Sequence, residues 1–523
     1  MSSQTKLTKV LAALLGCAVI CIVVLAVKLN SLSQAHAAHS AANHAAHGNS
    51  ANSHAGHGGA NSAANLANSV NSGGNSAQSG ANSHAAMHGS IANSQSTSGT
   101  NSNANSHSNM HAMMHGGSNS STGNSDSQNP PKPDLSIYRT LYAKPVSEWA
   151  KPNIDPSVES EWQELAPLPQ VVFPEDNKYS IIKAYLGLKL FNEPKLSKSG
   201  QIACQNCHNA QLGFGDGTSV SFGHDRQKGR RNSPNIQMAA FYDKLFWDGR
   251  ADSLEMQALM PMVDPVEMAN TLEVSEKSAK QLSKLYPLFA LAFGDENMVK
   301  SWGAHYPDLL KTDENATREF RADRVKIDPQ TLKKFTPAQI NAVKKLITTE
   351  NIAKAIATYE RSPFVVPTNT RFNRFIKGEY DRLTDEELWG LDLFRNKGEC
   401  MNCHYGAILS DNKFHNVGLS YFGEERQDLG RYEITGDKAD LGKFKTPSLV
   451  NVRNTAPYFH TGGFGNLRMT LTMGYNTAFS MYETEADKNR KGDPLYPVKD
   501  PLIRDLNLTR DEMNALVAFL NTL

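Results

Sequence analysis

The chain has no cysteine to spare for a structural disulfide. Of its six cysteines, Cys17 and Cys21 lie in an apolar segment, and the other four form two C-x-x-C pairs. An excess of charge of one sign is also missing, since 53 basic residues stand against 52 acidic ones. Such a balance gives no indication of a nucleic-acid partner or an anionic surface. We therefore expect no nucleic acid among its partners.

Large apolar residues are nearly absent between residues 31 and 129, where the chain consists mainly of Ser, Asn, Ala, Gly and His. Such a tract cannot bury enough surface to offset the entropy lost on ordering. We expect residues 31–133 to form a disordered tether. The tract contains 11 of the 17 histidines. These would suit loose binding of copper or nickel, but a plain solvated spacer is the favoured interpretation.

An uncharged run of 18 residues, Val10 to Val27, lies near the N-terminus and follows two lysines. It is just long enough to cross the apolar core of a bilayer, and the basic N-terminus favours export of the rest of the chain. We predict a membrane anchor over residues 1–30 and a periplasmic body tethered to the inner membrane. A signal peptide cleaved near Ala35–Ala37 is the main alternative, and a lipoprotein signal ending at Cys17 is less favoured. All three export the body.

A histidine directly follows each C-x-x-C pair, as CQNCH at residues 204–208 and CMNCH at residues 400–404. Outside the tether only six histidines remain, so chance is a poor explanation for two of them standing here. In an exported protein, C-x-x-C-H is typical of covalent c-type haem attachment, in which the histidine becomes the proximal iron ligand. The residues concerned are Cys204, Cys207 and His208 in the first copy, and Cys400, Cys403 and His404 in the second.

A zinc site and a redox dithiol are the alternatives for these pairs. A zinc site made of all four thiolates would have to join pairs far apart in the sequence, and it would not need a histidine after both. A thioredoxin-like dithiol would need a nearby βαβ pattern, which the sequence lacks. We therefore predict two c-type haems.

A short sequence repeat precedes both motifs. YLGLKLF at Tyr185–Phe191 stands before the first, and LWGLDLF at Leu388–Phe394 stands before the second. Gly187 matches Gly390, and three of the apolar positions match as well. Each segment ends a run with helical apolar periodicity, so we expect each to be the end of a helix.

The second of these helices also has a recognisable start. Thr384 and Glu387 have the spacing of a capping box, which satisfies the first-turn N–H groups of a helix. Two related domains in one chain is the economical interpretation of the repeat. We predict a mostly α-helical protein with an N-terminal cytochrome c-like domain at residues 134–367 and a C-terminal one at residues 368–523.

Several longer motifs accompany the haem motifs. They are GHDR around His224, LFWDGRADSLEMQA at Leu245–Ala258, DPVEM at Asp264–Met268, FKTPSLVNVRNTAPYFHTGG at Phe444–Gly463, and TMG at Thr472–Gly474. With these motifs the chain, from about Tyr179 to its C-terminus, resembles the bacterial di-haem cytochrome c peroxidase family. The resemblance implies a cytochrome-c peroxidase that reduces hydrogen peroxide to water. It also implies electrons from reduced cytochrome c or a similar small redox protein, passed from the C-terminal to the N-terminal haem, and a homodimer.

The resemblance implies roles for residues of the first domain. His224 corresponds to a distal iron ligand that is withdrawn on reduction of the second haem; otherwise it would be a surface histidine. Glu267 corresponds to a distal carboxylate that moves a proton during peroxide cleavage, and Gln257 to a polar residue that orients substrate or water. Trp247 corresponds to an aromatic residue between the haems, which is compatible with a place in the core.

For the second domain, the resemblance implies Met473 as the distal ligand, because a thioether stabilises ferrous iron. Met469, one helical turn earlier, is its competitor. A family variant with tyrosine at this position oxidises a protein substrate, so methionine argues against that route. Asn232, Thr455 and Pro457 correspond to positions that bind one calcium ion, for which amide and carbonyl oxygens are suitable donors.

The chain also departs from the family pattern. Soluble members lack the anchor and tether, and residues 295–335 look like a charge-rich insertion that would affect the donor or dimer surface. No third C-x-x-C-H motif exists, so direct reduction by quinol lacks an obvious entry haem. Two other functions stay open: a di-haem electron carrier or redox sensor without turnover, and a di-haem oxidase of a protein or organic substrate.

Overall fold

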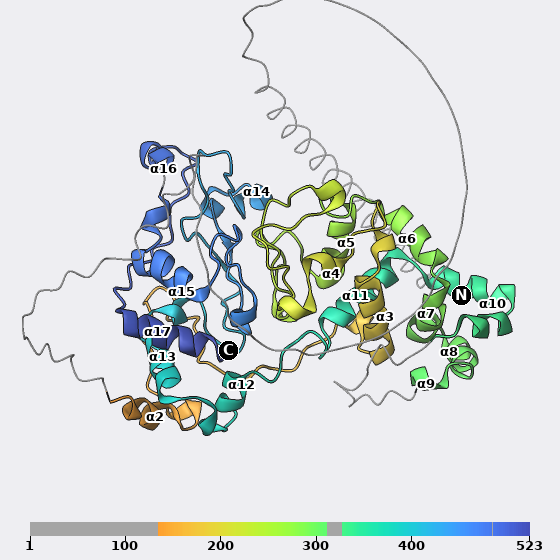
Figure 1. Cartoon of the computed structure of the whole chain (residues 1–523), viewed down its shortest axis with the longest axis horizontal. Helices are drawn as coiled ribbons and strands as arrows, with labels where there is room; N and C mark the ends of the chain where they lie inside the picture. Colours follow the sequence, from red (N-terminus) through yellow and green to blue (C-terminus); the bar gives the residue numbers. More distant parts are fainter. Residues whose placement is uncertain (1–133, 311–326, 484) are drawn as a thin grey trace, which may run out of the picture. The chain divides into compact units, whose positions relative to one another are not determined.

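The computed structural model describes residues 134–310, 327–483 and 485–523 (Figure 1). The predicted anchor and tether lie outside these residues. Within the described ranges, no helix is both long and apolar enough to span a membrane. Apart from isolated bridges and one antiparallel pair of two-residue strands, β1 Phe414–His415 and β2 Phe444–Lys445, the regular structure there is helical. The prediction of a mostly α-helical protein is confirmed for this part of the chain.

Most of the helices pack around one of two hydrophobic cores. We call residues 169–367 the first half, and residues 368–523 together with 136–168 the second half. The helices of the first half are α3 Ile181–Phe191, α4 Cys204–Cys207, α5 Leu254–Val263, α6 Leu272–Gln281, α7 Tyr286–Phe293, α8 Glu296–Gly303, α9 Pro307–Leu310, α10 Pro337–Leu346 and α11 Thr349–Glu360. Those of the second half are α2 Ser136–Tyr142, α12 Arg371–Ile376, α13 Asp385–Arg395, α14 Tyr432–Thr435, α15 Leu467–Met469, α16 Glu485–Arg490 and α17 Arg510–Leu520.

The same helix crossing occurs in both cores. In the first half α3 packs against α11, and in the second half α13 packs against α17 (Figure 1). A Cβ added to Gly187 would lie 1.9 Å from the carbonyl oxygen of Ala355, and one added to Gly390 would lie 2.0 Å from that of Ala515. Only glycine permits so close an approach of two backbones. The two glycines matched in the sequence therefore occupy the same position in two copies of one helical unit.

The helices that cross begin with side-chain caps. Thr384 and Glu387 form the predicted capping box of α13: the Glu387 N–H donates to the Thr384 hydroxyl at 3.3 Å, and the Thr384 N–H donates to the Glu387 carboxylate at 2.8 Å. Ser180 caps α3 and Thr348 caps α11 in the simpler way, each accepting one backbone N–H. Each cap satisfies donors that have no partner within the helix.

Residues 136–168 pack with the second core, although they precede the first haem motif in the sequence. Tyr142 and Trp149 are buried there. α2 packs against α13, and the Tyr142 hydroxyl donates to Asp392 of α13 at 2.6 Å. This packing differs from the predicted domain boundary at residue 134, because the apolar side chains of the segment cover a face of α13 that α17 leaves open.

The segment predicted as an insertion, residues 295–335, joins the first core at both of its ends. The rings of Trp302 and Phe335 stack with centroids 3.8 Å apart, and Leu309 is fully buried. Residues 311–326, between these ends, lie outside the described residues. The described ends of the insertion are therefore part of the packed interior of the first half.

Candidate haem sites and the region between them

The first C-x-x-C-H motif forms a single helical turn. α4 spans Cys204–Cys207, and the His208 N–H donates to the Cys204 carbonyl at 2.9 Å. The Nδ1 of His208 lies 3.2 Å from the Phe214 carbonyl oxygen, to which it can donate. That bond leaves Nε2 with its lone pair, as an iron ligand requires. Burial lowers the pKa of His208, which keeps the ring neutral.

The second motif repeats this arrangement. A turn over Cys400–Asn402 brings the His404 N–H to the Cys400 carbonyl at 2.8 Å, and the His404 Nδ1 lies 2.9 Å from the Leu409 carbonyl oxygen. Burial lowers the pKa of His404 as well. All four thiols of the two motifs are free. Each motif thus offers two thiols and an imidazole with an available Nε2, a donor set that fits one haem.

The four thiols do not converge on a zinc site. Within the described part of the chain, the one cluster of potential metal ligands is Cys403, Asp411 and His415, which takes no thiol from the first motif. The Nδ1 of His415 lies 2.6 Å from Asp500 and its Nε2 lies 2.8 Å from Asp411. Although burial opposes it, these carboxylates raise the pKa of His415 to about 12. A protonated ring has no lone pair for a metal, so this cluster is a buried ion-pair group.

His224 and Glu267 lie on neighbouring segments of the first half. The His224 N–H donates to the carbonyls of Val266 and Glu267, at 2.9 and 2.8 Å. A Cβ added to Gly223 would lie 2.1 Å from the Val266 oxygen, so the two segments touch through their backbones. The Nδ1 of His224 is buried without a hydrogen-bond partner among the described residues, and its Nε2 lies 3.4 Å from Asp225. The ring is therefore not committed to a bond that would prevent it from binding iron.

The Glu267 carboxyl is half-buried and makes no hydrogen bond to a described residue. Burial, and then the charge of Asp264, raise its pKa to about 7, while Arg250 opposes the shift. Gln257 lies on α5, also half-buried and with its side chain free of bonds to described residues. A carboxyl that can be protonated or ionised near neutral pH is suited to acid–base work.

Trp247 connects the two halves. Its indole N–H donates to the Asn232 carbonyl of the first half at 2.9 Å. Its own carbonyl accepts from the Lys445 N–H of the second half at 2.8 Å. Its ring stands edge-on to the buried ring of His460, with centroids 6.3 Å apart. The structure thus places Trp247 at the junction of the two halves, and its role between the haems stays a prediction.

The polar loop after His224 is held to the second half by ion pairs that sequence reasoning did not find. Arg231 donates to both carboxylate oxygens of Asp428, at 2.7 and 2.8 Å, and to Asp248 of its own half at 2.5 Å. Arg230 pairs with Glu433 at 2.5 Å. Two adjacent arginines were a visible signal, but Asp428 and Glu433 lie 197 and 203 residues further along the chain.

Met473 lies in a turn of π-helix, Thr470–Gly474, a rare form that often marks functional sites. Met473 and Met469 both pack against one small apolar cluster. Tyr475 is partly buried and packs against the same core as Cys400 of the second motif. Burial raises its pKa, and the Cys403 thiol is the next cause of that shift. The segment therefore faces the second haem motif, and the choice of Met473 over Met469 stays a prediction.

The three predicted calcium ligands lie on segments that contact one another. The Asn232 N–H donates to the His460 carbonyl at 2.7 Å, which brings it to the segment that carries Thr455 and Pro457. The Asn232 amide nitrogen donates to the Thr218 carbonyl at 2.9 Å, so its side-chain oxygen is available as a donor atom. The calcium site itself stays a prediction.

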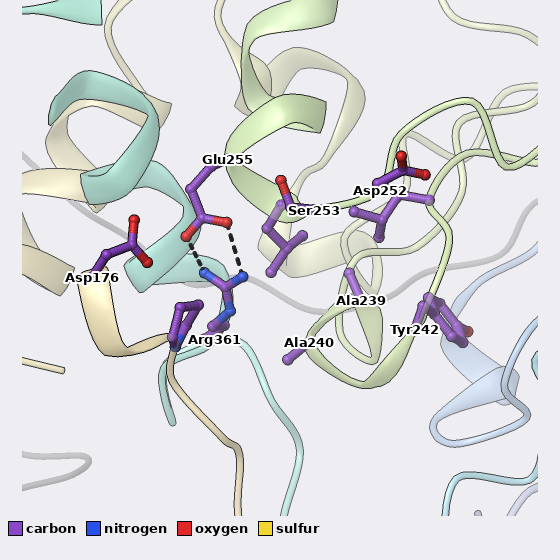
Figure 2. A pocket seen from close by; sticks show the side chains of 11 residues that line it. Asp176, Ala239, Ala240, Tyr242, Asp252, Ser253, Glu255 and Arg361 are labelled. Atoms are coloured by element: carbon purple, nitrogen blue, oxygen red, sulfur yellow. Dashed lines mark hydrogen bonds and ion pairs between the residues drawn. The ribbon is translucent and has the colours of Figure 1, made fainter. Parts of the chain in front are cut away.

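A cavity of about 400 Å³ opens beside the start of α5 (Figure 2). Asp176, Tyr242 and Ser253 are among the residues that line it. Arg361 also lines it, and both oxygens of Glu255 hold its guanidinium, at 2.5 and 2.9 Å. None of the predicted site residues lines this cavity.

Two copies of one helical unit, each presenting a thiol pair and an available imidazole, define a di-haem protein of the cytochrome type. Residues 182–313 match the family model described as di-haem cytochrome c peroxidase. The cytochrome c551 peroxidase of Pseudomonas aeruginosa is 30% identical over 287 residues, covering 54% of this chain and 68% of that protein. That of Nitrosomonas europaea is 29% identical over 342 residues, covering 65% and 79%. The chain belongs to the di-haem cytochrome c peroxidase family, and it is a peroxidase, an oxidoreductase whose family uses two haems.

The chain is also similar to proteins with other names. The methylamine utilization protein MauG of Methylorubrum extorquens is 28% identical over 355 residues, covering 68% of this chain and 81% of that protein. Among solved structures, a variant of the diheme peroxidase BthA from Burkholderia thailandensis matches with a TM-score of 0.50 and 20% identity. It covers 69% of this chain and 89% of that one. This likeness supports the fold.

Proposed function

We propose that this peroxidase reduces hydrogen peroxide to water with electrons from a reduced cytochrome c or a similar small redox protein. Each peroxide takes two electrons and two protons and gives two molecules of water. Electrons enter at the second half and pass through Trp247 to the first half, where peroxide binds. The position of Trp247 carries the proposal, because this residue of the first half is bonded to Lys445 and stands edge-on to His460, both of the second half.

The cysteines of each motif would hold one haem covalently, and His208 and His404 would bind its iron. Once bound, haem supplies the redox-active iron for the reaction, and the protein supplies ligands, a proton carrier and gating. The free thiols and the Nδ1 contacts of both histidines support this assignment. In the second half Met473 is the distal ligand.

His224 closes the first site until the second half is reduced, and its withdrawal then makes room for peroxide. The N–H of His224 is bonded to the carbonyls of Val266 and Glu267, so movement of His224 must also disturb the segment that carries Glu267. Glu267 then takes a proton from one peroxide oxygen and delivers it to the other, as a general base and then a general acid. Gln257 orients the peroxide or a water molecule.

The remaining parts of the proposal concern the setting of the enzyme. The body lies in the periplasm, residues 1–30 hold it to the inner membrane, and residues 31–133 act as the tether. A calcium ion between Asn232, Thr455 and Pro457 fixes the junction of the halves, and the working form is a homodimer. The calcium assignment is supported by Asn232, whose amide nitrogen donates to Thr218 and leaves its side-chain oxygen available as a ligand.

A second candidate function is oxidation of a protein or organic substrate, which the resemblance to MauG favours. Methionine rather than tyrosine at position 473 argues against it. An electron carrier without turnover is the third.

One titration separates the three functions. The half-reduced holoprotein is mixed with reduced cytochrome c and measured amounts of hydrogen peroxide, and oxidised cytochrome c is counted. A peroxidase oxidises two molecules of cytochrome c per peroxide and shows a high-spin haem on half reduction. A carrier shows no peroxide consumption, and an oxidase consumes peroxide without matching oxidation of cytochrome c; either result overturns the proposal.

A further inference from the structure

The last residue of α11, Glu360, is a buried carboxyl with no visible reason to be there. Its side chain is 3% exposed, and its Oε2 has no hydrogen-bond partner among the described residues. Placing an ionised carboxylate in an apolar interior without a partner costs several kcal/mol, on the order of the whole stability of a small domain. Buried polar atoms without partners are rare in native proteins and call for a specific explanation.

The cation next to Glu360 in the chain is not available to it. Arg361 follows it in the chain, but the guanidinium of Arg361 is held by both oxygens of Glu255 (Figure 2). Burial raises the pKa of Glu360 to about 8, against the influence of Arg361 and with that of Glu255. The carboxyl therefore accepts a proton near neutral pH.

The second half shows what the fold itself requires at this position. Tyr359 of α11 and Phe519 of α17 occupy the same position in the two halves. A Cβ added to Gly187 would lie 2.7 Å from the Tyr359 Cβ, and one added to Gly390 would lie 2.7 Å from the Phe519 Cβ. Three residues further on, the hydroxyls of Ser362 and Thr522 donate to the carbonyls of Tyr359 and Phe519, at 2.6 and 2.7 Å. The two helices thus end in the same register.

In that register, Glu360 corresponds to Leu520. Leu520 is 6% exposed and belongs to the second core. An apolar side chain therefore satisfies the packing at this position, and the carboxyl of Glu360 is a feature of the first half alone. Stability of the fold does not account for it.

Glu360 lies near the first haem motif. The ring of Tyr359, its neighbour, packs on Phe191 with centroids 5.2 Å apart, and Phe191 lies 6.3 Å from the ring of His208. Burial raises the pKa of the Cys204 thiol, and the charge of Glu360 is the next cause of that shift, so the two groups lie near each other.

We propose that Glu360 takes up one proton from solvent with each electron that reaches the first haem site and releases it when the electron leaves. An electron adds negative charge to a buried site, and the electron and an ionised carboxylate would repel each other strongly at low dielectric. Protonation of Oε2 removes that repulsion. The reduction potential of the first haem then depends on pH, whereas the second haem, with Leu520 in this place, lacks this dependence. The inference rests on the proposal that the first motif holds a haem.

The ionisable groups on the helices packed against α11 are held by other partners. Glu255 on α5 and Arg361 are paired with each other, and Lys183 on α3 donates to Asn177 and to the Lys178 carbonyl. Glu276 on α6 is bonded to Lys280 and to Thr349, at the opposite end of α11 from Glu360.

Glu267 also acts on the Cys204 thiol, and its pKa is raised to about 7. Two carboxyls of the first half can therefore respond to an electron there. The experiment must compare variants, because the wild-type dependence on pH contains both contributions.

The test is a spectroelectrochemical titration of both haems in the holoprotein, between about pH 6 and pH 9. One proton taken up with one electron changes the equilibrium constant tenfold per pH unit, so this contribution approaches about 59 mV per pH unit between the pKa values of the group in the oxidised and the reduced protein. Glu360→Gln keeps the shape of the side chain but removes its ionisable carboxyl. Glu360→Leu places in the first half the residue type that Leu520 provides in the second. Glu350→Gln, at the exposed start of the same helix, is the matched control.

We expect Glu360→Gln to lose the pH dependence of the first haem potential around pH 8, with the second haem and the Glu350→Gln variant unchanged. The same slope in wild type and Glu360→Gln would overturn the inference, as would a wild-type first haem with no pH dependence. If Glu360→Leu fails to load haem, Glu360→Gln alone decides. Peroxide turnover is measured separately, so absence of peroxidase activity with this slope intact would refute the proposed function and leave the inference standing.

Discussion

Replacing Gly187 by alanine should destabilise the first half and leave the second half largely unaffected. The added Cβ would lie 1.9 Å from the Ala355 carbonyl oxygen and 2.7 Å from the Tyr359 Cβ, whereas real Cβ contacts essentially never fall below 3.0 Å. α3 and α11 must therefore separate by about 1 Å. Overpacking typically costs about 1–3 kcal/mol. Since a backbone carbonyl in a packed helix cannot rotate away, we expect about 3 kcal/mol, the upper end of that range.

The measurement is denaturant unfolding of the holoprotein, followed by far-UV circular dichroism and by the absorbance of each haem. A protein with two cores need not unfold in one step, so midpoints are compared for each haem separately. Gly390→Ala should shift the second haem in the same way, and Gly465→Ala, where the added Cβ meets nothing within 4 Å, is the control. A Gly187→Ala midpoint equal to that of Gly465→Ala would mean that α3 and α11 do not cross as closely as described.

Three further predictions concern the site and the N-terminal part. Glu267→Gln should keep both haems and the loss of His224 on half reduction, while turnover falls by about 10²–10⁴-fold because the proton carrier is gone; full activity would remove Glu267 from the reaction. Met473→His should lower the potential of the second haem, because the preference of the thioether for ferrous iron is lost; an unchanged potential would point to Met469. A chain without residues 1 to about 130, exported by another signal, should keep both haems and full turnover, and a loss of either would show that this part is more than a tether.

The residues that carry the chemistry could be predicted because haem attachment demands fixed residue types at fixed spacing. The turn at residues 204–208 presents its histidine as the motif requires. Gly187 and Gly390 were recognisable as a repeat from the sequence. Their partners, Ala355 and Ala515, were not, because a contact between helices remote in sequence leaves no local pattern.

Other features were missed because a sequence does not show burial. A glutamate followed by an arginine at the end of a helix, as at Glu360, has the pattern of a solvated surface, and only the packing of α11 shows that the carboxyl is enclosed. Residues 136–168 were predicted to belong to the N-terminal domain because of their place in the chain, although their apolar side chains pack on α13. Residues that are adjacent to one domain in the sequence can therefore pack in the core of the other.

The contacts at the junction suggest how reduction of the second half could open the first. Arg231, on the loop after His224, is held by Asp428 of the second half and by Asp248 of its own half. If Asp428 released it, Arg231 would keep Asp248 as a partner, and the buried Asp428 would keep Arg230, 3.3 Å away, so neither charge would be left unpaired. An element that contacts both halves in this way is a candidate for coupling them. Movement of the loop would then reach His224, whose N–H bonds join it to the Glu267 segment, so that exposure of the site and placement of the proton carrier would occur together.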